Sequence, residues 1–445
     1  MGSHDEHPVL GTTLEKIACV RLPKEPSSSL WDITIKDGRI SSINKHDACT
    51  AAHHQAPSVL HAGNRLIAPS LCHAHVHIDK AFLLQDEKFS DLQIERGDFK
   101  EAMELGSKAK ARFSEEDLLR RGRQLIDESI RYGVTAMRAF VEVDGVVDLK
   151  CLEAGLTLKR EFMDRCEIQI CAFAQLALFS GEDGGQKVRE LMTTAASFQE
   201  VEVLGSTPYV EDDEDKSKHN VHWISSLALE HQKHLDLHLD YYIEEDKQPL
   251  IWDTISIIKS KNWSEKQGKT ISLGHCTRLT RFGDNEWSRL RQEIGHLPVS
   301  FVGLPTSDLF IMRTSDGLRG TLPITQIIKE HGLNAAISVN NVCNSFTPHG
   351  NCDPLSLAQL GVGLYHAGTK QDAELLYETV SSRAKAVIGC EYTSLRLEPG
   401  QPADFVLFDR LESGWRCRKS IHEVVYDAGS VRRTIFRGQI TSSSG

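Results

Sequence analysis

Residues 73–80 read His-Ala-His-Val-His-Ile-Asp-Lys, and the interpretation of the whole chain depends on them. They follow a short apolar run at 66–68, which we predict to be the first strand of a β/α region. Residues i and i+2 of an extended chain point to the same side, so His75 and His77 can converge on one ion. Neutral imidazole is a common ligand of zinc and iron. The stretch alone fits a histidine-rich turn without metal equally well, so the positions of the other histidines decide.

Two further histidines stand at the ends of predicted strands: His238 ends the fifth apolar run and His275 ends the sixth. Amphipathic helical patterns, such as 115–132, separate the runs. Eight runs over about 325 residues match the size of a (β/α)8 TIM-type barrel, with an open doubly wound sheet as the alternative. Barrel active sites lie at the carboxyl ends of the strands, so four histidines are expected at one mouth. The runs lie at 66–68, 135–137, 168–173, 201–204, 235–238, 271–275, 299–302 and 335–339.

Both ends of the chain have a different, all-β texture. Residues 31–35 and 39–43 alternate around Lys36-Asp37-Gly38, which is typical of a hairpin turn. Near the other end, 403–408, 423–426 and 431–438 also resemble strands. We therefore predict a small β-sandwich domain built from 1–65 and 393–445, around a catalytic barrel at 66–392.

Composition narrows the class of protein and its partners. The 445 residues include 51 basic and 62 acidic side chains, a net charge of −11, which argues against nucleic acid or an anionic membrane as the main partner. No apolar run reaches the length of a membrane span, and the start lacks a signal peptide's apolar core. The 11 cysteines are irregularly spaced without a C-x-x-C, as expected for reduced thiols in a cytoplasmic protein. A small-molecule substrate is expected, and a homo-oligomer is left open. The acidic run 211–215 is predicted to be a solvated loop.

Taken in order, the motifs of the chain resemble the amidohydrolase superfamily, and within it the group of cytosine deaminase and N-isopropylammelide amidohydrolase. The resemblance covers almost the whole chain, and it rests on the order and spacing of the motifs rather than on any one of them. It implies the barrel and the flanking β-sandwich. The matching segments are 32–40, 75–80, 132–135, Gln175, 236–238, 274–275, 346–353 and 399–404.

The resemblance also implies a role for each matching residue. His75, His77 and His238 would hold one divalent metal ion, with Zn2+ expected first and Fe2+ or Mn2+ as alternatives. His275 would hydrogen-bond the attacking water or the tetrahedral oxygen, and Gln175 would contact a ring amide of the substrate. Lys80 and Asp79 would line the mouth beside these groups.

Three positions depart from the family pattern. The aspartate that binds metal and accepts the proton of water falls on Asn340, an amide that cannot act as that base. The glutamate that shuttles the proton falls on Tyr241, a phenol of pKa about 10 that donates a proton more readily than it accepts one. The histidine near the end of the second strand falls on Phe140, with Glu142 and Asp144 as candidate substitutes.

The sequence thus predicts a metal-dependent amidohydrolase or deaminase that hydrolyses a C–N bond of a small cyclic amide, amidine or related heterocycle. The catalytic candidates are His275, Asn340 and Tyr241, and the substrate-binding candidates are Gln175, Lys80 and Glu142. The alternative is a variant with a degenerate metal site, which catalyses a non-hydrolytic step or only binds a ligand. An engineered Asn340 would leave Tyr241 and Phe140 unexplained.

Overall fold

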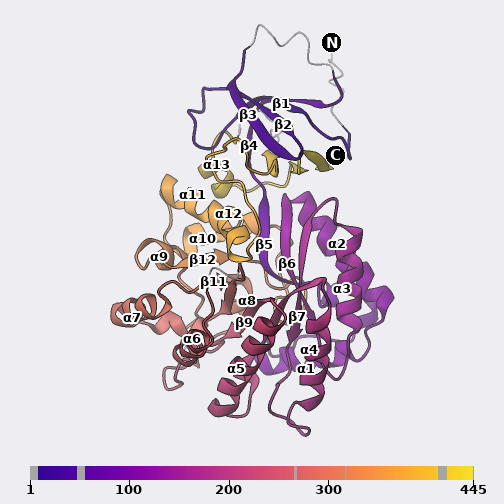
Figure 1. The fold of residues 1–445 in the computed structure, drawn as a ribbon, viewed down its shortest axis with the longest axis vertical. Coiled ribbons are helices and arrows are strands. Elements are labelled where there is room, and N and C mark those ends of the chain that lie inside the picture. Colours follow the sequence, from indigo (N-terminus) through magenta and orange to yellow (C-terminus); the bar gives the residue numbers. More distant parts are fainter. Residues whose placement is uncertain (1–8, 48–55, 265–267, 316, 409–417, 444–445) are drawn as a thin grey trace.

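The computed structural model describes residues 9–47, 56–264, 268–315, 317–408 and 418–443, so Cys49 and Cys417 lie outside the described residues. A barrel of strands and helices makes up the larger part of the molecule, and a mixed sheet from both chain ends stands beside it (Figure 1). No helix of the described residues is long and apolar enough to cross a membrane.

Eight parallel strands form the barrel, and each neighbours the next one along the chain. Residues after the last strand close the ring against the first: the Asn340 N–H donates to the His75 carbonyl (3.0 Å), and the His77 N–H donates to the Asn340 carbonyl (2.8 Å). The prediction of a (β/α)8 barrel is confirmed, and the open sheet is excluded. The strands are β5 (Leu71–His77), β6 (Val134–Glu142), β7 (Glu167–Ala174), β8 (Val201–Ser206), β9 (His234–Leu239), β10 (Ile271–His275), β11 (Val299–Gly303) and β12 (Asn334–Ile337).

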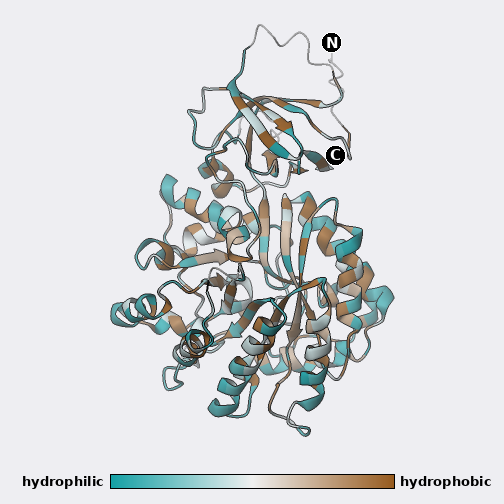
Figure 2. Cartoon of the chain, viewed as in Figure 1, coloured by the Kyte–Doolittle hydropathy of each residue, from teal (hydrophilic) through white to brown (hydrophobic). Residues whose placement is uncertain are grey.

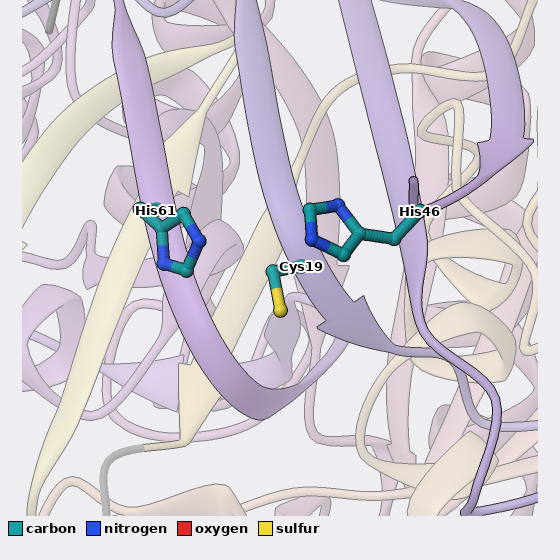
Figure 3. A group of neighbouring side chains, drawn as sticks. All are labelled: Cys19, His46 and His61. Carbon is teal, nitrogen blue, oxygen red and sulfur yellow. The ribbon is translucent and has the colours of Figure 1, made fainter. Parts of the chain in front are cut away.

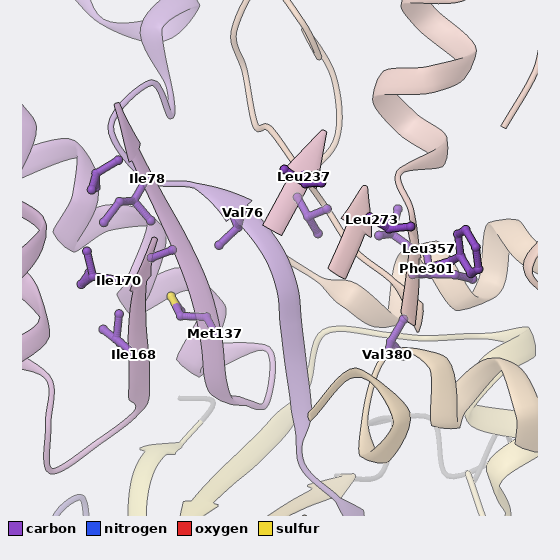
Figure 4. Close-up of a cluster of buried hydrophobic side chains, with 14 of the residues drawn as sticks. Val76, Ile78, Met137, Ile168, Ile170, Leu237, Leu273, Phe301, Leu357 and Val380 are labelled. Carbon is purple, nitrogen blue, oxygen red and sulfur yellow. The ribbon is translucent and has the colours of Figure 1, made fainter. Parts of the chain in front are cut away.

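Helices surround the strands, with their hydrophilic residues facing outward (Figure 2). In α2 a capping box between Ser114 and Asp117 fixes the first turn, and buried residues at helical spacing, such as Leu118 and Leu125, face the barrel. Figure 4 shows the apolar layer into which outward-facing strand side chains such as Met137 and Leu273 pack. The helices are α1 (Phe99–Lys110), α2 (Glu115–Arg131), α3 (Lys150–Glu161), α4 (Gln186–Ser197), α5 (Glu214–Glu230), α6 (Ile251–Ser260), α7 (Asp284–Ile294), α8 (Pro305–Ile311), α9 (Ile324–Lys329), α10 (Pro354–Leu364), α11 (Lys370–Thr379), α12 (Ser382–Val387) and α13 (Ile421–Tyr426).

The mixed sheet joins the two ends of the chain, in the order β15-β14-β13-β4-β1-β2-β3. Its seam is the antiparallel pair β4–β13, where Phe405 lies opposite Pro69. The predicted hairpin is present between β2 and β3, with Asp37 and Gly38 at φ 52° and 71°, the left-handed conformation that such turns need. The strands are β1 (Lys16–Arg21), β2 (Trp31–Lys36), β3 (Arg39–Lys45), β4 (Val59–Pro69), β13 (Phe405–Phe408), β14 (Arg432–Phe436) and β15 (Gln439–Ser443).

The assignment of the first barrel strand from sequence was wrong. The run 66–68 belongs to β4 of the mixed sheet, and the first barrel strand is β5, so His73, His75 and His77 lie on a strand rather than after one. Both segments are buried, and only Pro69 and Ser70 separate the run 66–68 from β5. Short apolar runs carry no information about which sheet they join.

Two further local predictions were wrong. Residues 423–426 belong to helix α13, in which Ile421, Val424 and Val425 are buried at helical spacing. The acidic run is only partly a solvated loop, because Asp213 caps α5 and Glu211 accepts hydrogen bonds from neighbouring backbone N–H groups.

Candidate functional site

Four imidazoles meet at the carboxyl end of the barrel: His75 and His77 from β5, His238 from β9 and His275 from β10. The ring centroids of His75 and His238 are 4.5 Å apart, and those of His238 and His275 are 5.0 Å apart. A Cβ at Gly274 would lie 3.1 Å from Cε1 of His75, so the absence of a side chain there gives that ring room. The four histidines predicted to share one mouth therefore lie together.

The imidazoles of His75, His77 and His238 are buried and neutral, which suits metal ligands. Burial, together with nearby cationic groups such as Lys80, holds the pKa values of His75, His77 and His238 well below their usual range. Among the described residues, both ring nitrogens of His75, Nδ1 of His77 and Nε2 of His238 have no hydrogen-bond partner. Buried polar atoms normally have a partner, and a bound cation would provide one here. These ring nitrogens are therefore suitable ligands for a divalent metal ion.

A close group of potential ligand atoms at this mouth differs from the predicted triad. One atom each from His75, His238 and His275 lies within 4.8 Å of the other two. The His77 ring is 5.3 Å from that of His238, centroid to centroid, and lines the adjoining cavity. The ligand set His75, His77 and His238, with His275 in a catalytic role, therefore stays a prediction.

Asn340 lies beside these histidines in the left-handed conformation, at φ 65°. Its Nδ2 donates to Oγ of Ser307 (2.7 Å), whereas its buried Oδ1 has no partner among the described residues. The amide lines the same cavity as His77 and His238. Asn340 therefore offers a neutral amide oxygen to the cavity.

Asp308 was missed in the sequence, although it makes the closest polar contact to His275. Its Oδ1 is 2.8 Å from Nδ1 of His275, while Oδ2 accepts from the Thr321 hydroxyl (2.7 Å) and the Leu304 N–H (3.3 Å). Burial raises the pKa of this carboxyl, although its hydrogen bonds oppose that shift. In the sequence, Asp308 is only an acidic residue a few positions after the seventh apolar run. Acidic residues are common in the first turn of a helix, so its position did not mark it as part of the site.

Asp236 belongs to the matching segment 236–238, but the sequence alone predicted no role for it. The structure buries it on β9 beneath the imidazoles, where Oδ2 pairs with Nη1 of Arg138 at 2.8 Å and Oδ1 is 3.9 Å from Nδ1 of His75. It therefore supports the site from inside the barrel.

Tyr241 packs its ring against His275, with the centroids 3.8 Å apart. Its buried hydroxyl has no partner among the described residues. Burial, with smaller contributions from Asp308 and Tyr209, raises the pKa of this phenol well above its usual value. Tyr241 thus stays protonated and can donate a hydrogen bond, but it cannot serve as a base near neutral pH.

A cavity of about 240 Å³ opens onto these groups. Lys80 and Gln175 line it, and Nζ of Lys80 donates to Oε1 of Gln175 (3.2 Å). A second cavity of about 370 Å³ adjoins the first and shares Lys80, Gln175 and Phe346 with it. The first cavity is lined by His77, Lys80, Gln175, Tyr209, His238, Tyr241, His275, Asn340, Asn341 and Phe346.

Glu142 belongs to a buried ionic chain that lines the second cavity. Its carboxylate accepts from Lys80 (2.5 Å) and Lys110 (2.5 Å), and Lys110 also reaches Asp144 (2.6 Å). Burial would raise the pKa of Glu142, but the two ammonium groups outweigh it and lower the pKa to about 2. Phe140 stacks on His75, with centroids 4.0 Å apart, so β6 supplies an apolar ring there instead of a ligand.

Comparisons with known proteins find relatives that match most of the chain. The chain is 24% identical over 387 residues to N-isopropylammelide isopropyl amidohydrolase of Pseudomonas sp. (strain ADP), a match covering 87% of this chain and 89% of that protein. It is 22% identical over 406 residues to pterin deaminase of Rhizobium rhizogenes, covering 90% and 87%. No family model matches the chain.

Solved structures match over nearly the whole chain. The structure of 5-methylcytosine deaminase from Klebsiella pneumoniae with phosphonocytosine superposes with a TM-score of 0.82 at 22% identity, covering 97% of this chain and 98% of that one. An adenosine deaminase from Xanthomonas campestris with bound zinc gives 0.66 at 15% identity, covering 97% and 93%. The barrel and the mixed sheet therefore recur together in other proteins.

Proposed function

We propose that the chain is an enzyme of the amidohydrolase superfamily and that it hydrolyses a C–N bond of a small cyclic amide, amidine or related nitrogen heterocycle. The observation that carries the proposal is the convergence of buried, unpartnered imidazoles with the His275–Asp308 pair beside a cavity of about 240 Å³. The relatives named above are amidohydrolases and deaminases. We further propose Zn2+ as the metal, held by His75, His77 and His238, with Fe2+ or Mn2+ as alternatives.

His275 is the proposed proton carrier. A bound divalent cation would supply the nucleophile by lowering the pKa of water. If the Nδ1–H of His275 donates to Asp308, Nε2 carries a lone pair and can accept the proton of the attacking water. The same nitrogen can return that proton to the departing nitrogen as the C–N bond breaks. Asn340 has no proton-accepting carboxylate, so this work falls to His275.

Other side chains of the cavity are proposed to orient the heterocycle. Tyr241 keeps its proton and can donate it as a hydrogen bond to a ring or leaving nitrogen. Gln175 and Lys80 present polar groups that match a ring amide. Glu142, held between two ammonium groups, would fix the position of Lys80 and so act on substrate through it.

A second candidate follows from Asn340 and Phe140. An amide and an apolar ring stand where the family pattern has an acid and an imidazole, so the site can have lost hydrolysis and kept binding. Such a protein would bind the same heterocycles without releasing an amine.

The finer parts of the proposal concern setting and partners. A cytoplasmic location fits the barrel cysteines, because no disulfide joins those that the structure describes. The partner is a small molecule, and assembly into a homo-oligomer stays open.

One experiment separates hydrolase from binder. Zinc-loaded protein, never exposed to chelator, is incubated with cyclic amides, amidines and aminated pyrimidines and pterins, and released ammonia or amine is measured. We expect release with at least one compound, and its loss in His238→Ala. No release from any compound, together with saturable binding of the same compounds by calorimetry, would replace the hydrolase with the binding protein.

A further inference from the structure

A second group of metal-ligating side chains lies in the mixed sheet, away from the barrel mouth. Cys19 comes from β1, His61 from β4, and His46 directly follows β3. Figure 3 shows the three side chains facing one another, with Cys19 between the two imidazoles. One potential ligand atom of each lies within 4.8 Å of the other two.

The backbone is distorted at the point that presents Cys19. The register of β1 shifts between Ile17 and Val20 against β2, and between Ala18 and Val20 against β4. Cys19 itself has φ 62°, the left-handed region that residues with a side chain seldom adopt. Bulges of this kind re-aim a side chain, and strained positions of this kind cluster at functional sites.

A carboxylate behind the cluster orients one of the imidazoles. Oδ1 of Asp32 is 2.7 Å from Nδ1 of His46 and also accepts from the N–H of Cys19 (3.0 Å). Oδ2 of Asp32 pairs with Lys16 (2.8 Å). A carboxylate that holds one ring nitrogen leaves the other free to ligate, as behind most metal-bound histidines.

Access and the atoms around the sulfur also suit an ion. The His46 imidazole is only 8% exposed, whereas His61 is exposed, so an ion can enter from solvent. The Cys19 thiol donates to Oδ1 of Asn64 (2.8 Å). When the thiol loses its proton, the Asn64 amide can turn and donate its N–H to the thiolate instead.

We propose that Cys19, His46 and His61 form a second metal site, which binds Zn2+ through one thiolate and two imidazoles with water in the fourth position. Thiolate and imidazole are the usual zinc ligands, and three protein ligands with water in the fourth position are the number found in zinc sites with an open position. The three ligands come from separate segments of the sheet, so the ion would clamp β1, β4 and the residues after β3 together.

Cobalt provides a readout that the barrel site cannot imitate, because Co2+ bound by a thiolate shows a ligand-to-metal charge-transfer band in the near ultraviolet. The barrel group of the described residues contains no cysteine. We expect metal-free full-length protein to develop the band as Co2+ is added, with saturation by about two equivalents because the barrel site also takes up the ion, and we expect zinc to abolish the band. The band should persist in the double variant His75→Ala/His238→Ala, which removes the barrel ligands.

Two variants test the ligands separately. Cys19→Ser should eliminate the band. His61→Ala, at an exposed position where folding is not at risk, should weaken cobalt binding at least about tenfold, the lower end of the loss caused by removing even an outer-shell partner. His296→Gln, at an exposed histidine elsewhere, is the control. The absence of the band in the wild type would overturn the proposal. So would a band in Cys19→Ser or His61→Ala that reports the same affinity for Co2+ as in the wild type. Both results count against the proposal whatever the barrel site binds.

Discussion

Replacing Asp308 by asparagine is expected to move the proton on the His275 ring. The Leu304 N–H can only donate, so the side-chain oxygen of the new amide must stay on that side of residue 308. The NH2 group then faces Nδ1 of His275, at the place where a carboxylate oxygen now lies 2.8 Å away. Since NH2 can only donate, Nδ1 must accept, and the ring proton moves to Nε2. Asp308→Asn therefore keeps the shape of the site but removes its base.

The size of the effect follows from the role of that base. Proton transfer by a positioned side chain contributes about 10²–10⁴-fold to rate, so kcat should fall at least about 10²-fold. Each factor of ten equals about 1.36 kcal/mol, which makes the loss about 2.7 kcal/mol or more in the barrier. All three hydrogen bonds of residue 308 find a donor and an acceptor again, so Tm, KM and zinc content should change little.

The assay is amine release by zinc-loaded protein with the best substrate of the panel, alongside thermal unfolding and elemental analysis. Thr321→Val is the matched control, because it removes one donor to the same carboxylate and leaves the contact with His275 in place. Its kcat should stay within about tenfold of the wild type, below the range for loss of a general base. If the kcat of Asp308→Asn also stays within about tenfold of the wild type, while the fold and the metal remain intact, the reasoning about the tautomer is refuted.

Three other predictions follow from named contacts. Asn340→Asp should tighten zinc binding about tenfold or more, because a carboxylate ligand is added and the Ser307 hydroxyl can reverse its hydrogen bond; equal affinity in equilibrium dialysis would place residue 340 outside the site. Burial, and secondly the nearby cations, lower the pKa of His234 in the folded protein to about 3, whereas its value in the unfolded chain is about 6.5. The unfolded chain therefore binds one more proton between these two values, and the folded state loses stability as the pH falls from about 6.5 towards about 3. Between pH 7.5 and 5.5 this loss is about 1.4 kcal/mol, and urea unfolding should find it absent in His234→Gln but present in His296→Gln. Glu142→Gln should destabilise the fold by about 3–5 kcal/mol, because it leaves the buried ammonium of Lys80 without its carboxylate partner, whereas Lys110 keeps Asp144. A folded variant whose kcat no longer depends on pH near neutrality would instead identify Glu142 as the base.

Much of the fold could be predicted from local pattern. Apolar runs at regular spacing gave seven of the barrel strands, and the Lys36–Gly38 turn gave the hairpin of the mixed sheet. The boundary between β4 and β5 could not be found this way. Pairing partners decide it, since β4 pairs with β13 and β5 with β6, and no local pattern contains a partner.

The candidate site, too, could be predicted from the sequence only in part. His75, His77, His238 and His275 could be placed at one mouth because strand ends in a barrel converge. Their separate roles stay predictions. The importance of Asp308 depends on a tertiary contact with His275, and the pairing of Glu142 with Lys80 and Lys110 joins separate elements. Contacts of that kind leave no trace in residue spacing.

The backbone at residue 340 limits which side chains the site can acquire over evolution. Its left-handed conformation favours glycine, asparagine and aspartate over other residues. The two hydrogen bonds that close the barrel there come from the main chain, so they persist whichever of these side chains is present. Exchange between acid and amide is therefore the change that disturbs the fold least. A lineage could lose or regain a carboxylate at this mouth by drift, with barrel closure intact, and select afterwards for whatever chemistry the new side chain allowed.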